Sequence, residues 1–184
     1  FVRENIPYKI VGGVNFYARK EIKDLLCYLK TIDNAQDDLA VKRIINVPKR
    51  GIGATTIAKV QDYADENGMS FYAALRQAEE ISTLSKATAT KIRPFVTFIQ
   101  MLRSKLPYIS VEQLMDEIIE DTGYVAELDA EGTDEARARI ENIDELISKI
   151  VAYEESVEQP TLSGFLEEVA LIADIDNLEE DSDY

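Results

Sequence analysis

The sequence lacks histidine and tryptophan altogether, and its 184 residues include a single cysteine, Cys27. These absences exclude histidine-dependent nucleophile pairs and triads, Cys/His zinc sites and a disulfide framework. The chain also lacks an apolar run of the roughly 20 residues that a helix needs to span a bilayer. Because a lone thiol and the lack of an export leader fit a reducing compartment, we expect a cytoplasmic location and no membrane partner. The first residue is Phe1 rather than Met, so we expect a piece of a longer polypeptide.

Basic residues are in the minority, with 20 Lys and Arg against 35 Asp and Glu. They are unevenly distributed, because residues 1–105 carry 17 basic and 11 acidic residues whereas residues 106–184 carry three and 24. Residues 41–61 and 81–111 each contain five basic residues and no acid. Since physiological salt screens charges beyond about 8–10 Å, such a window can attract a polyanion despite the acidic remainder. Solvated helix faces explain the same pattern equally well.

Hydrophobic periodicity predicts an all-α helical bundle with one short N-terminal strand. The strand is expected at residues 6–11 and is followed by Gly12 and Gly13, which we interpret as a strand-to-helix turn or hinge. Apolar residues at three-and-four spacing predict helices near residues 20–30, 38–45, 56–67, 70–80, 86–106, 110–122, 134–154 and 162–173.

Three local expectations accompany these helices. Leu39 and Ile44 are expected to face inward from the second helix. Thr55 or Thr56 is expected to cap the third helix, because a hydroxyl oxygen can accept from the amides of a first helical turn. Pro94 is expected to interrupt or kink the helix over residues 86–106, because proline lacks the amide hydrogen that continues the helical ladder.

No catalytic motif is found in the sequence. Its eight glycines never form the phosphate loop in which two glycines four residues apart precede Lys and Ser or Thr. Neighbouring carboxylates such as Glu79 and Glu80 are typical of solvated helix faces. We therefore expect no catalytic residue, no metal site and no cofactor in this chain.

The most informative segment is NVPKRGIGATT, residues 46–56, which lies between two expected helices. Glycines let the main chain approach a phosphate closely, and their amides and those of the next helix can point at one anion. The apolar residue between the glycines is expected to turn inward. This helix-hairpin-helix-like element predicts contacts with the DNA backbone by Lys49, Arg50, Gly51, Ile52, Gly53, Ala54, Thr55 and Thr56. A tight turn with incidental basic residues is the alternative.

A second candidate lies at the start of the helix expected over residues 86–106. Lys86, Thr88 and Lys91 can face a phosphate at that helix N-terminus. The window contains no glycine, so a plain surface helix is an equally good interpretation.

Three stretches together resemble the 2B subdomain of UvrD/PcrA/Rep-type superfamily 1 DNA helicases, with the PcrA-like branch nearest. They are IPYKIVGGVNFYARKEIKDLLCYL, RIINVPKRGIGATTI and RARIENIDELISKI, in this order. The resemblance covers nearly the whole chain, and the three stretches together are far more specific than any one of them. The chain departs from the family at Ser85, where glycine is frequent, and at Pro94, in a helix usually free of proline.

The resemblance implies a division into three segments. Residues 1–13 are the strand and crossover from the RecA-like domain 2A, residues 14–173 the helical 2B subdomain, and residues 174–184 an acidic connector that returns to 2A. It also implies an accessory or regulatory role in an ATP-dependent 3′-to-5′ DNA helicase, in which this subdomain grips the duplex DNA backbone ahead of the fork without sequence specificity.

Partners and cofactors are implied in the same way. The expected partners are double-stranded DNA, the helicase domains 1A, 1B and 2A, and proteins of DNA repair or DNA replication. ATP and Mg²⁺ are expected in the parent helicase, whereas this chain without the ATPase motifs is expected to be inactive by itself. The family signature Arg-x-Glu-Asn is matched at Arg139, Glu141 and Asn142 with Glu145 beyond it, and we interpret these as polar residues that pack helices.

The alternative function comes from the acidic half of the chain. Residues 106–184 would then form a protein-interaction or autoinhibitory helical module that docks onto a basic surface and makes little contact with DNA.

Overall fold

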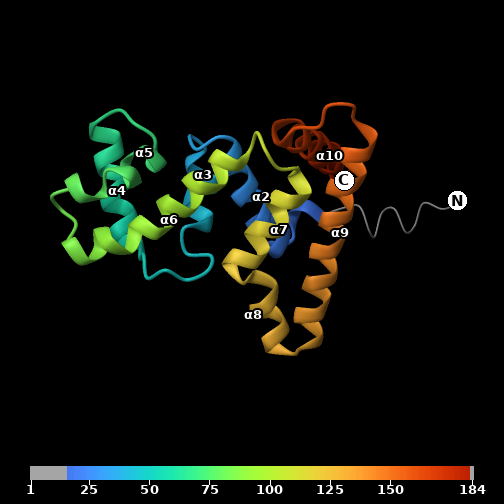
Figure 1. Cartoon of the computed structure of the whole chain (residues 1–184), viewed down its shortest axis with the longest axis horizontal. Helices are drawn as coiled ribbons and strands as arrows, with labels where there is room; N and C mark the ends of the chain where they lie inside the picture. Colours follow the sequence, from blue (N-terminus) through green and yellow to red (C-terminus); the bar gives the residue numbers. More distant parts are fainter. Residues whose placement is uncertain (1–15, 183–184) are drawn as a thin grey trace, which may run out of the picture. The chain divides into compact units, whose positions relative to one another are not determined.

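The computed structural model describes residues 16–182 of the chain, with side chains described to residue 176 (Figure 1). The predicted strand at residues 6–11 and the predicted hinge at Gly12 and Gly13 lie outside the described residues.

Every regular element within residues 16–182 is helical, which confirms the predicted all-α class. The α-helices are α2 (Lys20–Asp33), α3 (Asp38–Ile44), α4 (Ala54–Glu66), α5 (Phe71–Arg76), α6 (Lys86–Lys105), α7 (Val111–Thr122), α8 (Tyr124–Glu131), α9 (Asp134–Ser156) and α10 (Leu162–Ser182). Two short 3-10 helices are η1 (Phe16–Ala18) and η2 (Ala78–Glu80). The start of the segment predicted as an acidic connector, residues 174–182, continues α10. None of the helices within residues 16–182 combines the length and the apolar character needed to cross a membrane.

The chain forms two compact units, although no change in composition marks the division. Residues 24–126 form the central unit, and of the other described residues, 16–23 and 127–182 form the terminal unit. Within the central unit, α5 packs against α3, α4 and α6, and η2 packs against α6 (Figure 1). The fully buried side chains at its centre are aromatic and branched aliphatic: Tyr28, Leu29, Val41, Ile44, Ile52, Phe71, Ile92 and Phe95.

Side-chain caps set the starts of most helices in the central unit. Asp37 accepts from the amide of Ala40 at the start of α3, and Ser70 and Ser85 cap α5 and α6 in the same way. The predicted capping box at α7 is present, because Ser110 and Gln113 each bond the main chain of the other. Short polar side chains therefore satisfy amides that a helix leaves without partners.

One local expectation for α3 is wrong. Leu39 was expected to face inward but is 82% exposed, while Ala40, Val41 and Ile44 form the buried side of α3. Leu39 and Ile44 are five residues apart, which places them about 140° apart around a helix, so one of them must leave the core side. Pro94 was expected to interrupt or kink α6, and the interruption is absent because α6 runs unbroken from Lys86 to Lys105, whereas the kink stays a prediction.

In the terminal unit, polar side chains of α9 bond the buried carboxylate of Glu21 at the start of α2. Glu21 is only 4% exposed and accepts a hydrogen bond from Asn142 Nδ2 at 2.7 Å. Arg19 donates in turn to Asn142 Oδ1 at 2.6 Å, and Arg139 Nε lies 3.9 Å from Glu21 Oε1. Arg139 and Asn142 thus pack helices, as predicted, whereas Glu141 of the same signature is exposed.

The contact between α9 and α10 depends on glycine at position 164, which has no Cβ atom. Phe165 of α10 stacks edge-on against Tyr153 of α9, with ring centroids 5.6 Å apart. A Cβ atom at Gly164 would overlap the Tyr153 hydroxyl and lie 3.1 Å from Thr161 Oγ1. A side chain at residue 164 would therefore force the Tyr153 ring to move.

We expect Gly164→Ala to lower the free energy of unfolding by about 1–3 kcal/mol, the usual range for overpacking, although alanine is the better helix former. Thermal unfolding followed by circular dichroism measures this loss. The exposed neighbour substitution Ser163→Ala is the control and should change stability by less than about 0.5 kcal/mol. In a Tyr153→Phe background the loss should shrink, and an equal loss in both backgrounds contradicts the explanation.

Candidate nucleic-acid interface

The segment between α3 and α4 forms a closed turn, which we call the glycine hairpin (residues 46–53). Asn46 holds it from within: its Oδ1 accepts from the amides of Ile52 at 3.1 Å and Arg50 at 3.4 Å, and its Nδ2 donates to the Ile52 carbonyl. Ile52 is 1% exposed, which confirms that it turns inward. The helix-hairpin-helix assignment itself stays a prediction.

Arg50 faces into the protein, unlike a side chain that waits for a phosphate. Its Nη1 donates to the carbonyls of Ile44 and Ile45, both at 2.9 Å, and its Nη2 donates to the Tyr28 hydroxyl at 2.8 Å. The guanidinium carbon lies 4.8 Å from the centroid of the buried Phe95 ring. A cation on the last carbonyls of α3 is favourable because these carbonyls lack helical partners and form the negative end of the helix dipole.

The Tyr28 hydroxyl connects this cation to the hairpin. It donates to the Val47 carbonyl while it accepts from Arg50. Burial raises the pKa of the Tyr28 phenol, and the neighbouring Arg50 charge lowers it by a smaller amount. The phenol is therefore a neutral donor at neutral pH, which the bond to the carbonyl requires.

The outer side of the hairpin brings the two predicted basic windows together. Gly51 has a φ of +75°, and a Cβ built there would lie 3.7 Å from both Cδ and Nζ of Lys91. Lys91 is an exposed residue of α6, and Lys49 is an exposed residue of the hairpin. Lys91 of the second window therefore lies against the hairpin. A phosphate site shared by both windows would require this arrangement.

The other two residues of the second predicted DNA contact, Lys86 and Thr88, lie at the start of α6. Thr88 is engaged in the cap, where its amide donates to Ser85 Oγ at 3.1 Å and its hydroxyl pairs with the same oxygen at 2.8 Å. Lys86 is exposed at the first residue of the helix. Their role in DNA binding stays a prediction.

Helix α4 begins two residues earlier than predicted and has no side-chain cap. Its N-cap is Gly53 rather than Thr55 or Thr56, with an extended φ of −83° and ψ of 177°. The first turn of α4 contains no acid. Because the first amides of a helix have no intrahelical acceptor, they give this end a partial positive charge. We call the exposed set at this end the hairpin surface: Lys49, Gly51, Gly53, Ala54, Thr55 and Lys91.

Some cations of the two basic windows are neutralised by acids of the same unit. Three ion pairs involve the basic windows: Arg43 with Asp24, Arg93 with Glu79, and Lys105 with Glu117. For Lys49 and Lys91, no acid lies within ion-pair distance among the residues that the structure describes. These two lysines therefore keep their charge available to an external anion.

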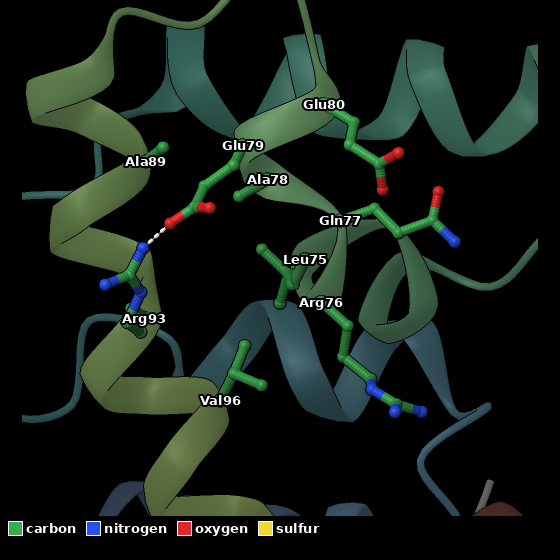
Figure 2. Close-up of a pocket in the computed structure, with 9 residues that line it drawn as sticks. All are labelled: Leu75, Arg76, Gln77, Ala78, Glu79, Glu80, Ala89, Arg93 and Val96. Carbon is green, nitrogen blue, oxygen red and sulfur yellow. Dashed lines mark ion pairs between the residues drawn. The ribbon is translucent and has the colours of Figure 1, made fainter.

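A hollow beside α5, η2 and α6 has a different character. It encloses about 520 Å³, and Figure 2 shows Arg93 of α6 reaching Glu79 of η2 across it. Arg76 and Glu80 also line it, so its cations and acids balance. This hollow is a poor anion site, in contrast to the hairpin surface.

Comparison with known proteins bears on the whole chain. The profile of the UvrD-like helicase C-terminal domain family matches residues 1–183. The chain is 44% identical over 178 residues to the ATP-dependent DNA helicase PcrA of Staphylococcus aureus and 44% identical over 179 residues to that of Bacillus subtilis. These alignments cover 96% and 97% of the chain but 24% of each relative. The chain thus spans about a quarter of the length of these relatives.

We expect Gly51→Ala to lower the free energy of unfolding by about 1–2 kcal/mol, because its positive φ is unfavourable for a residue with a Cβ atom. The space itself is sufficient, since 3.7 Å to Lys91 is an ordinary contact. Gly53→Ala is the matched control, because its φ of −83° suits alanine and nothing lies within 4 Å of its Cβ position. Alanine is the poorer N-cap but lowers the entropy of the unfolded chain, so we expect a net change of about 0.5 kcal/mol or less. Chemical denaturation measures both, and equal losses contradict the assignment of strain to Gly51.

Proposed function

The chain belongs to the family of UvrD-like helicase C-terminal domains, and from that membership we propose that it is the 2B subdomain of an ATP-dependent 3′-to-5′ DNA helicase. In this proposal it grips the backbone of duplex DNA ahead of the fork and does not read the bases. Domains 1A, 1B and 2A of the same polypeptide are its partners.

The observation that carries the proposal is the pairing of two uncompensated lysines with an uncapped helix start. Lys91 lies against Gly51, Lys49 is two residues before that glycine, and α4 begins at Ala54 without a side-chain cap. Cations and main-chain amides that converge in this way recognise phosphate oxygens, which carry no base sequence. Exposed glycines at 51 and 53 let the DNA backbone come close to the amides.

The strength of such binding follows from counterion release. If three to five phosphates are engaged, the slope of log affinity against log salt is about −2.7 to −4.5, because each neutralised phosphate contributes about −0.9. A sequence-independent contact of this size gives a Kd of about 10⁻⁴–10⁻⁶ M. Tight binding by the intact helicase then requires its other domains.

The motor chemistry belongs to the rest of the polypeptide in this proposal. ATP and Mg²⁺ bind the RecA-like domains, since the phosphate loop that cradles them is missing from this sequence. The subdomain acts on the helicase through the DNA that it holds.

We expect Lys49→Glu combined with Lys91→Glu to abolish the salt-sensitive binding of duplex DNA, because both uncompensated cations of the hairpin surface are reversed. Fluorescence anisotropy with a labelled short duplex at several salt concentrations measures this. The matched control is Arg137→Glu with Lys149→Glu on α9, which changes the net charge equally and should leave the slope unchanged.

Two outcomes of this titration contradict the duplex-grip proposal. One is that the wild-type chain does not bind, and the other is that the double variant binds as well as the wild type. Either result favours the acidic protein-interaction module over the DNA grip.

The purified chain is expected to show no ATP turnover, with or without DNA, because it lacks the phosphate loop. A coupled assay of phosphate release with Mg²⁺ and duplex or single-stranded DNA measures this, and the intact helicase serves as the positive control. DNA-stimulated hydrolysis by the chain alone would overturn the assignment to an accessory subdomain.

A further inference from the structure

We propose that Arg50 is a positioning residue for duplex binding: its guanidinium shapes the glycine hairpin from inside, and Lys49 and Lys91 supply the phosphate contacts. This inference rests on the proposed function, and it separates the two basic residues that are adjacent in the sequence. Lys49 is exposed and has no acid partner among the described residues, whereas Arg50 is half-buried and engaged.

The engaged groups of Arg50 leave it little capacity for another ligand. Both terminal nitrogens donate within the protein, Nη1 to the Ile44 and Ile45 carbonyls and Nη2 to the Tyr28 hydroxyl. One face of the guanidinium lies on the Phe95 ring at 4.8 Å. A phosphate could recruit Nη1 only if carbonyls at the end of α3 lost their donor, and buried acceptors without partners are unfavourable.

Phe95 and Lys91 explain how this buried contact reaches the surface. They are four residues apart on α6, so they lie on the same side of that helix. Phe95 is fully buried under Arg50, while Lys91 is exposed beside Gly51. The stacking of Arg50 on Phe95 therefore fixes how far the hairpin stands from α6, and with it the distance between Lys91 and Gly51.

The end of α3 is the second fixed point. Arg50 immediately precedes Gly51, and its side chain donates to the carbonyls of residues 44 and 45. Asn46 closes the same turn by its hydrogen bonds to Ile52. The hairpin thus has an inner frame made of Arg50, Asn46, Tyr28 and Phe95. Its outer surface consists of the glycines and the two lysines.

The salt dependence of duplex binding distinguishes a positioning residue from a phosphate ligand. Lys49→Gln and Lys91→Gln each remove one phosphate contact and should make the slope of log affinity against log salt shallower by about 0.9. Arg50→Lys keeps the charge but cannot form the planar fork, so we expect affinity to fall about two- to tenfold at every salt concentration with the slope unchanged. The assay is anisotropy with the full 184-residue chain and a labelled duplex.

A phosphate ligand at Arg50 predicts the opposite pattern. Lysine serves well as a point charge on phosphate, so Arg50→Lys would then bind nearly as the wild type does. Arg50→Gln would reduce the slope by about 0.9. Either result overturns the inference.

Two substitutions at other positions keep the test decisive if changes at Arg50 unfold the chain. Tyr28→Phe removes a hydrogen-bond partner of Arg50, and Phe95→Leu removes its stacking partner. Both residues are buried, and neither substitution changes the charge. Both should lower affinity without changing the slope. Unchanged affinity in both variants, with their folding verified by circular dichroism, overturns the inference.

Hydrogen exchange in the absence of DNA separates this inference from the proposed function. Arg50→Lys should speed amide exchange in residues 46–56, whereas Lys49→Gln should leave it unchanged. If the wild type binds no duplex, the proposed function fails even when exchange shows the expected difference. If the wild type binds but exchange is identical in both variants, the inference fails alone.

Discussion

The contact of the Arg50 guanidinium with the last carbonyls of α3 is the interaction on which the hairpin surface depends. The same planar guanidinium contacts the end of α3, the buried phenol of Tyr28 and the Phe95 ring of α6. A solvated arginine would fix none of these, since its many rotamers are nearly equal in free energy. The chain therefore uses one cation to shape its surface and two others to charge it. That division matters in a protein whose net charge is −15, because attraction of a polyanion must then come from a small and well-defined patch.

Features of the chain that depend on near neighbours could be predicted from the sequence. The capping box at Ser110 and Gln113, the buried stripe of α9 and the inward turn of Ile52 all involve residues within a few positions of one another. Helix periodicity and the chemistry of caps govern such features directly. The turn between α3 and α4 was likewise visible, because glycines between two segments of helical periodicity are a local pattern. Asn46 could also have been identified, as its amide bonds the main chain of the turn that follows.

Features that depend on distant residues could not be predicted. The orientation of Arg50 is decided by Tyr28 and Phe95, which come from two other helices, and nothing in the letters KRG distinguishes an inward arginine from an outward lysine. The approach of Lys91 to Gly51 has the same origin. The cap of α4 was misplaced for a different reason: threonine hydroxyls suit an N-cap, but the extended conformation at Gly53 starts the helix before they are reached.

The open start of α4 divides the attraction for an anion into two kinds. Main-chain amides carry no titratable proton, cannot be acetylated and survive most side-chain replacements, so their contribution is the same in every ionic form of the protein. It is also short in range, and it acts only on a ligand that is already in contact. The lysine ammonium groups act at a longer distance and can be silenced by modification or by salt. Under the proposed function, recruitment of DNA is therefore adjustable at this surface, whereas the final fit to the phosphates is constant.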